Sequence, residues 1–158
     1  MQRKMTEKLE RWFGTLPLHH IDTSILLEPI STEDGRICKR YLQKVGYNYR
    51  GTVSLHVLGE VTLKIMLLKD MEKRNVAFGL LADVIDARNI GYFTPRNLKL
   101  AYDVLEVDAR LSPTDAAIIA CAVEDRVSNL ITIDKKLIHN ISIEKNFRIR
   151  ISHPAELV

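Results

Sequence analysis

The sequence predicts an α/β fold of three layers, in which a mostly parallel, five-stranded sheet lies between two layers of helices. An extra helix is expected at the N-terminus. Short apolar stretches alternate along the chain with longer segments whose apolar residues recur at helical spacing. The inner strand segments, such as residues 129–133 ("NLITI"), show no polar alternation, which is typical of strands buried on both faces. The length of 158 residues is that of one domain.

The expected elements follow one another in a regular order. A helix over residues 2–13 is ended by Gly14 and Pro17. Strands are then expected at residues 18–22, 50–55, 89–93, 129–133 and 147–152. Helices are expected at residues 31–45, 55–71, 76–87, 94–105, 112–124 and 135–139. Thr94-Pro95 and Ser112-Pro113 each offer an N-cap followed by proline at the first helical position. The chain therefore divides into an N-terminal helical extension, residues 1–17, and a domain, residues 18–158.

The apolar side chains of these helices are expected to pack inside this arrangement. Leu80 lies on the apolar face of the helix over residues 76–87, and Trp12 is expected to anchor the N-terminal helix. The extension has two readings. It packs on the surface or at an oligomer contact, or its basic residues touch nucleic acid. Those basic residues are Arg3, Lys4, Lys8 and Arg11.

Charge and cysteine content restrict the environment and the partners. The net charge of +3 permits nucleic acid as a partner without requiring it. Cys38 and Cys121 lie in apolar helical patterns, which predicts buried free thiols in a reducing compartment and hence a cytoplasmic protein. No apolar run approaches 18 residues and the basic N-terminus lacks a signal-peptide core, so no membrane association is expected.

Four carboxylates stand near strand ends or on adjoining helices. Asp22 ends the first expected strand, Asp134 follows the strand at 129–133, and Glu60 and Asp115 lie on helices. The carboxyl ends of parallel strands lie along one edge of the sheet, where ligands bind. The four side chains are therefore expected to converge at that edge.

Each acid also has a local explanation. Asp22 or Asp134 could cap the turn that follows it, and Asp115 stands three residues after Ser112, as in a capping box. Glu60 precedes Lys64 by four residues, the spacing of a helix-surface ion pair. The site interpretation depends on the four acids occurring together.

Converging carboxylates repel one another, and a divalent cation removes that conflict. Ligands that are all oxygen suit Mg²⁺ or Mn²⁺ rather than Zn²⁺. A metal-bound water is a nucleophile at neutral pH, and two such ions can clamp a phosphodiester. The residues therefore favour a metal-dependent nuclease.

In order and in spacing, these motifs resemble those of PIN-domain ribonucleases, and in particular small prokaryotic, VapC-like members. The matching segments are "IDTSILLE" with Asp22, "SLHVLGE" with Ser54 and Glu60, "LSPTDAAIIACA" with Asp115, and "LITIDKKL" with Thr132 and Asp134. The resemblance covers about residues 18–158. It implies a five-stranded parallel sheet, one or two Mg²⁺ or Mn²⁺ ions, and cleavage of single-stranded or loop RNA by an activated water.

The resemblance also implies roles for individual residues. Asp22, Glu60, Asp115 and Asp134 would be the catalytic and metal-binding acids. Ser24 and Thr132 would be supporting hydroxyls that orient a ligand or a metal-bound water. Many relatives are toxins of VapBC-type toxin–antitoxin pairs and others process RNA, so an antitoxin protein joins RNA among the expected partners.

Substrate binding and assembly are less strongly indicated. Lys135 and Lys136 directly follow Asp134, which places them well to meet an RNA phosphate. A homodimer is expected on general grounds, with the N-terminal helix and the helix over residues 55–71 as contacts.

Two alternatives compete with this interpretation, and the residues argue against the second. The first is a non-catalytic PIN-fold module that binds RNA or protein, although such a module would not need all four acids. The second is a phosphatase of the haloacid-dehalogenase type. That class requires Asp-x-Asp after the first strand, and Ser24 stands at the second position.

Overall fold

The centre of the fold is a sheet of five parallel strands. The computed structural model describes the backbone of residues 2–158 and the side chains from residue 4 onward. The strands are β1 (Leu18–Ile21), β2 (Arg50–Ser54), β3 (Gly91–Phe93), β4 (Asn129–Ile131) and β5 (Arg150–Ser152). They pair in the order β3-β2-β1-β4-β5, and every pair is parallel. The predicted α/β class is confirmed, and the sheet is parallel throughout.

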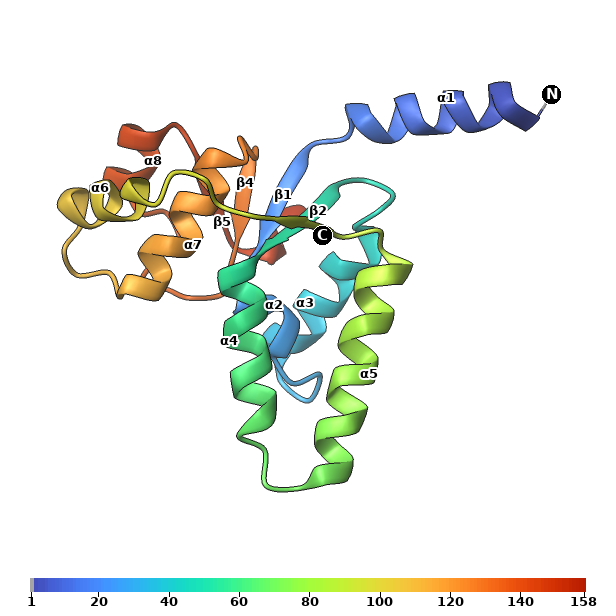
Figure 1. Ribbon diagram of the computed structural model, residues 1–158, viewed down its shortest axis with the longest axis horizontal. Helices are drawn as coiled ribbons and strands as arrows, with labels where there is room; N and C mark the ends of the chain where they lie inside the picture. Colours follow the sequence, from blue (N-terminus) through green and yellow to red (C-terminus); the bar gives the residue numbers. More distant parts are fainter. Residues whose placement is uncertain (1) are drawn as a thin grey trace.

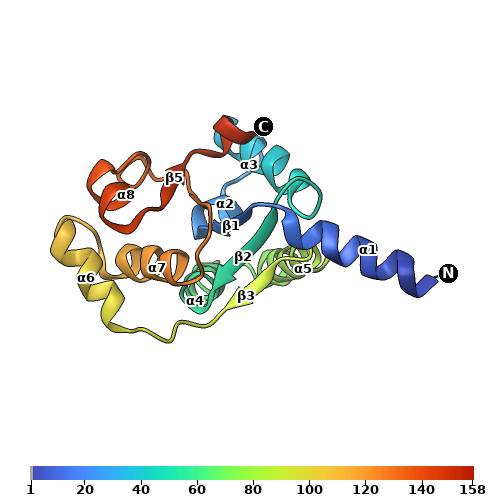
Figure 2. The same ribbon diagram turned by 90° about the horizontal axis from the view of Figure 1, so that it is seen from above.

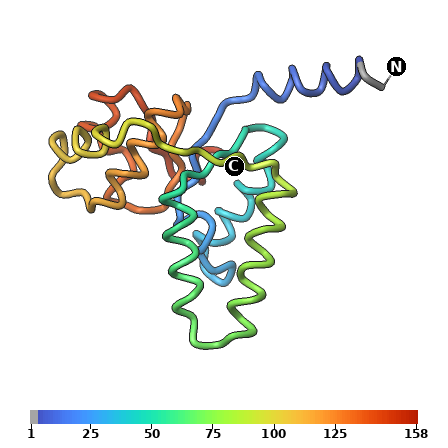
Figure 3. Tube along the Cα trace, viewed as in Figure 1, coloured from blue at the N-terminus to red at the C-terminus, as the bar shows by residue number. Residues whose placement is uncertain are grey.

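Helices cover both faces of this sheet (Figures 1 and 2). One side carries α2 (Thr23–Leu27), α3 (Glu33–Lys44) and α5 (Met71–Ala87), and the other carries α6 (Lys99–Val107), α7 (Pro113–Glu124) and α8 (Ile141–Phe147). α4 (Leu55–Met66) begins at the end of β2 and forms a helical hairpin with α5 that projects beyond the sheet (Figure 3). The short helix η1 (Pro154–Leu157) packs against α3. No helix in the described part of the chain is long and apolar enough to cross a membrane.

Hydroxyl caps fix where three of these helices begin. Thr32, Ser54 and Ser112 accept hydrogen bonds from the backbone N–H three residues on, at 2.9, 3.2 and 3.1 Å. Gly46 ends the turn after α3 with φ +87°, a conformation that glycine adopts at little cost. The expected helix starts at Ser31, Leu55 and Ser112 therefore hold to within two residues.

The N-terminal helix forms as expected but does not pack as expected. α1 (Gln2–Thr15) passes through Gly14 and extends away from the body of the molecule (Figure 1). Trp12 is 47% exposed and so is not the packing anchor that the sequence indicated. Four basic residues were singled out in the extension. The side chain of one of them, Arg3, lies outside the part of the chain whose side chains the structure describes.

The helix expected from residue 94 begins five residues later. Residues 94–98 are irregular, and the backbone N–H groups of Arg96 and Asn97 donate to the Glu124 carboxylate at 2.9–3.1 Å. These donors are therefore satisfied by a side chain of α7 instead of starting a helix. Thr94-Pro95 has the local features of a helix start, but a residue distant in sequence provides the better partner.

The helix expected at residues 135–139 is a turn, and a helix forms directly after it. His139 has φ +53°, which ends any helix at that residue, and Asn140 caps α8 by accepting from the N–H of Ile143 at 3.2 Å. The prediction missed α8 because a helix of seven residues is too short to show a clear helical period. The predicted boundary between residues 71 and 76 is also shifted, since Asp70 caps α5 through the N–H groups of Glu72 and Lys73.

The core contains two adjacent histidines on β1. His19 is buried beside Tyr41, whose hydroxyl lies 2.9 Å from Nδ1, and stacks on Tyr49 with ring centroids 4.3 Å apart. His20 points to the opposite face, is fully buried, and has no hydrogen-bond partner for either ring nitrogen within the described residues. Burial lowers the pKa of His19 to about 4 and that of His20 to about 3, so both rings are neutral in the fold.

These buried rings predict a loss of stability in mild acid. Below about pH 6.5 the two histidines bind protons in the unfolded chain but stay neutral in the folded chain. The free energy of unfolding therefore falls as pH falls. Between pH 6 and pH 5 the free energy of unfolding of His20→Leu is expected to fall by about 1 kcal/mol less than that of the parent protein. The reason is that the variant has one buried histidine fewer. Urea unfolding at the two pH values measures this difference. An exposed-ring variant, His56→Leu, is the control, and equal losses in His20→Leu and the parent protein would contradict the prediction.

Candidate active site

The topology creates one special position along the carboxyl edge of the sheet. The chain moves from β1 to β2 and β3 on one side, and later returns to place β4 and β5 on the other side of β1. In open parallel sheets, ligands bind outside the carboxyl ends of the two strands where the order reverses. Those strands are β1 and β4. Asp22 directly follows β1, and Thr132 and Asp134 follow β4.

Asp22 is a buried carboxylate at this position. It precedes α2 as its N-cap residue, but its side chain makes no capping hydrogen bond. Instead its Oδ2 accepts from the hydroxyls of Ser24 at 2.7 Å and Thr132 at 2.8 Å. Only 6% of Asp22 is exposed, and no described cationic side chain forms an ion pair with it.

This environment opposes the charge on Asp22. Burial raises the pKa of the carboxyl above its usual value. The hydroxyls of Ser24 and Thr132, and the backbone N–H groups of Thr23 and Ser24, offset only part of that rise. Neutral hydroxyls hold the carboxylate in place without supplying a compensating charge. The local explanation for Asp22, a helix cap, is therefore not realised.

The two hydroxyls also join the segments that follow β1 and β4. The Oγ of Ser24 lies 3.3 Å from the Oγ1 of Thr132 and accepts from the backbone N–H of Ile133 at 3.2 Å. The Oγ1 of Thr132 in turn accepts from the N–H of Asp134 at 3.0 Å. Ser24 and Thr132, both singled out in the sequence, thus form one hydrogen-bonded network with Asp22 at the switch point.

Glu60 lies in the second turn of α4, on the same side as α2. Its Oε2 accepts from the Thr23 hydroxyl at 2.7 Å, and its Oε1 forms an ion pair with Lys64 at 2.8 Å. Burial by itself raises the pKa of Glu60, but the bonds from Lys64 and Thr23 outweigh it and leave the pKa lowered. Sequence reasoning missed Thr23 as a partner of Glu60. Its position beside Asp22, in "DTS", was the available signal.

The remaining acids are held by local contacts. Asp115 accepts from the Ser112 hydroxyl at 2.7 Å, as in the capping arrangement that its spacing indicates. The Oδ1 of Asp134 accepts from the backbone N–H of Lys136 at 2.8 Å, which closes a tight turn. Lys135 and Lys136 are both exposed beside this turn.

The structure brings Asp22, Ser24, Thr132 and the Asp134 backbone together, and it joins Glu60 to α2 through Thr23. The expected gathering of four carboxylates is not seen in this arrangement of side chains. Within the described residues, no three acids, histidines or cysteines lie close enough to hold a metal ion. The all-oxygen donor set and the uncompensated charge of Asp22 fit a hard cation at Asp22. The other three carboxylates, as they stand, do not complete its coordination.

Comparison with known protein families identifies the domain. The PIN domain matches residues 20–142, which is most of the chain. The chain belongs to the PIN-domain family. The match begins within β1, so α1 lies outside the part of the chain that defines this PIN domain. No curated protein sequence matches the chain.

Solved structures agree with this PIN fold. FitAcB from Neisseria gonorrhoeae superposes with a TM-score of 0.64 at 16% identity, over 87% of this chain and 98% of that one. VapBC2 from Rickettsia felis, bound to a promoter DNA fragment, gives 0.63 at 14% identity, over 86% and 98%. A toxin–antitoxin complex from Klebsiella pneumoniae gives 0.59 at 20% identity, over 86% and 97%.

One of these neighbours is a toxin–antitoxin complex, and another is VapBC2 bound to DNA. At such identities they establish the fold and not the activity. The PIN domain is a nuclease family, and the buried acid at the switch point is the feature of this chain that bears on activity.

Proposed function

We propose that this PIN domain is a metal-dependent endoribonuclease that hydrolyses phosphodiester bonds in RNA. The observation that carries the proposal is the buried carboxylate of Asp22, which lies at the switch point and has only neutral hydroxyls as side-chain partners. A charge in such a place is costly unless something compensates it. A bound divalent cation would supply that compensation.

Mg²⁺ or Mn²⁺ is the proposed cofactor, because all the nearby donors are oxygens. Asp22 would be the primary ligand, and Glu60, Asp115 and Asp134 would be the further metal-binding acids, after the changes in side-chain position that their present contacts require. When bound, the ion would activate a water and stabilise charge on the phosphate.

The chain's own groups have separable tasks in this proposal. Ser24 and Thr132 donate to the same oxygen of Asp22 and so orient the carboxylate. Thr23 and Lys64 hold Glu60 on the adjoining helix, where Lys64 also limits the negative charge of the site. Lys135 and Lys136, exposed after β4, would attract the RNA backbone.

An antitoxin and a second copy of the chain are the proposed protein partners. The support is the likeness to a toxin–antitoxin complex and to VapBC2, which is a likeness of fold. A cytoplasmic location is also part of the proposal. It is consistent with Cys38 and Cys121, which are buried and unpaired as expected from the sequence.

One specific observation favours the alternative, a PIN-fold module that binds RNA or protein without cleaving it. Glu60 is already neutralised by Lys64, and three of the four acids are held by local contacts. An inactive domain would keep these contacts in the presence of metal.

Cleavage of labelled single-stranded RNA decides between the two. The purified protein is expected to cut RNA with Mn²⁺ or Mg²⁺ and to be silent in EDTA. RNA that is bound but uncut in every metal, at protein concentrations well above the dissociation constant, would favour the binding module. Cleavage that persists in EDTA would contradict the role of the metal.

A further inference from the structure

The N-terminal helix exposes an apolar stripe that nothing in the described chain covers. Met5, Leu9 and Trp12 recur at helical spacing along one face of α1 and are 65%, 58% and 47% exposed. α1 extends away from the domain and lies outside the PIN match (Figure 2). An apolar stripe on a projecting helix marks an interaction surface.

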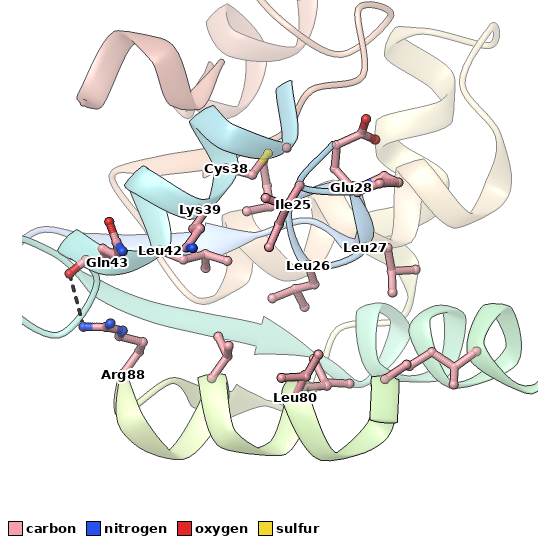
Figure 4. Close-up of a pocket in the computed structure, with 17 residues that line it drawn as sticks. Ile25, Leu26, Leu27, Glu28, Cys38, Lys39, Leu42, Gln43, Leu80 and Arg88 are labelled. Atoms are coloured by element: carbon pink, nitrogen blue, oxygen red, sulfur yellow. Dashed lines mark hydrogen bonds between the residues drawn. The ribbon is translucent and has the colours of Figure 1, made fainter. Parts of the chain in front are cut away.

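The same chain contains an apolar groove that its own described side chains leave open. The groove measures about 570 Å³ and runs between α2, α3 and α5. Its walls are mostly aliphatic, and Leu80 on α5 is 61% exposed beside it, although its helical position predicted burial (Figure 4). Leu80 therefore lies on the apolar face of its helix, but most of its side chain is not covered by other described residues.

The helix is held at its base so that it points away from the body of its own chain (Figure 1). Only Leu16 and Pro17 separate α1 from β1. The Arg50 side chain donates to the carbonyl of Leu16 at 3.0 Å, and the Arg50 N–H donates to the carbonyl of Pro17 at 2.8 Å. These bonds fix the direction in which α1 leaves the sheet, so any helix that fills the groove comes from another molecule.

The stripe matches the groove in length, and the dipole of α1 matches the charges at the two ends of the groove. The stripe from Met5 to Trp12 is roughly 10 Å long, and the α5 wall from Leu80 to Arg88 is roughly 12 Å long. The groove has Glu28 at one end and Arg88 and Lys39 toward the other (Figure 4). A helix that enters with its N-terminus toward Glu28 would place its positive dipole end near that acid and its negative end near the two cations.

We propose that α1 of one copy of this chain binds in the α2–α3–α5 groove of a second copy, with Met5, Leu9 and Trp12 against its apolar walls. Reciprocal exchange of α1 gives two identical contacts related by a two-fold axis, so the assembly closes as a dimer. The proposal is independent of the nuclease activity, because none of the acids or hydroxyls of the candidate active site lines the groove.

Trp12 provides a direct test, because it is the only tryptophan in the chain. Its emission is expected to move to shorter wavelength as protein concentration rises, when the indole enters the apolar groove of a partner. Leu80→Glu, at an exposed position on α5, is expected to abolish this shift although Leu80 and Trp12 belong to different elements. Emission that does not depend on concentration, or a shift that survives in Leu80→Glu, would overturn the proposal.

Light scattering on the same proteins gives the second readout. Leu9→Glu and Leu80→Glu are each expected to halve the mass of the parent dimer. Arg11→Gln is the matched control, since it changes the charge of α1 by the same amount from the opposite face and should leave the dimer intact.

Mixing the two disrupted variants separates this arrangement from other contacts. A Leu9→Glu chain keeps a sound groove and a Leu80→Glu chain keeps a sound helix, so the mixture is expected to form a heterodimer through one contact. If the dimer formed by packing of α1 against α1, Leu80→Glu would remain a dimer. If the groove bound a different protein, Leu80→Glu would have the same mass as the parent protein. Either result would overturn the proposal.

Discussion

Replacing Asp22 by Asn is expected to remove metal-dependent RNA cleavage while the fold survives. The amide keeps the size of the carboxylate, and its oxygen can still accept from Ser24 and Thr132. It cannot supply the negative charge that a divalent cation requires. The loss of activity should exceed about 100-fold, because changing groups that only support a metal ligand already costs roughly 10- to 100-fold.

Asp22→Asn is also expected to change the stability of the fold. Burial raises the pKa of Asp22, so the folded state favours its protonated form and loses stability as pH rises through that pKa. Asp22→Asn should therefore unfold at a higher urea concentration than the parent protein at pH 7. The gain should vanish in acid, where Asp22 is itself neutral.

Cleavage rates and urea midpoints are measured on the same preparations, with Asp83→Asn as the control at an exposed acid on α5. The control should match the parent protein in both. An Asp22→Asn variant that is as active as the parent would contradict the site assignment. One that is inactive because it is unfolded would contradict the account of Asp22 as an unfavourable buried charge.

Mn²⁺ is expected to raise the melting temperature of the metal-free protein. A ligand that binds only the folded state stabilises it by about 2.7 kcal/mol at a concentration 100 times its dissociation constant. For a domain of this size that corresponds to a rise of roughly 5–10 °C. The physical source here is relief of the charge on Asp22, together with the recruitment of Glu60, Asp115 and Asp134.

Calorimetry with and without Mn²⁺ measures this rise, and Asp22→Asn provides the comparison. The variant should start from a higher melting temperature in EDTA and gain little from Mn²⁺. Equal rises in both proteins would place the ion elsewhere on the surface. No rise in the parent protein would count against a metal site at Asp22 and would favour the binding-module alternative.

The sequence alone was enough to predict the architecture. Alternating apolar strands and periodic helices are local patterns, and they led to a mostly parallel sheet of five strands, the helical layers and the positions of Asp22 and Asp134 at strand ends. Helix starts with strong hydroxyl caps, such as Ser54 and Ser112, were also predictable, because the cap and its partner lie three residues apart.

Tertiary structure decided what depends on residues far apart in the chain. Glu124 takes the N–H groups of Arg96 and Asn97 and delays α6, and Thr132 reaches Asp22 across 110 residues of sequence. Thr23 donates to Glu60 across 37 residues of sequence, a contact that the spacing of Glu60 and Lys64 does not indicate. The sequence by itself determined which groups stand at the carboxyl edge of the sheet. Only the packed chain decided which of them remains a buried charge without a counter-ion, because burial and partnership are set by neighbours that local patterns do not specify.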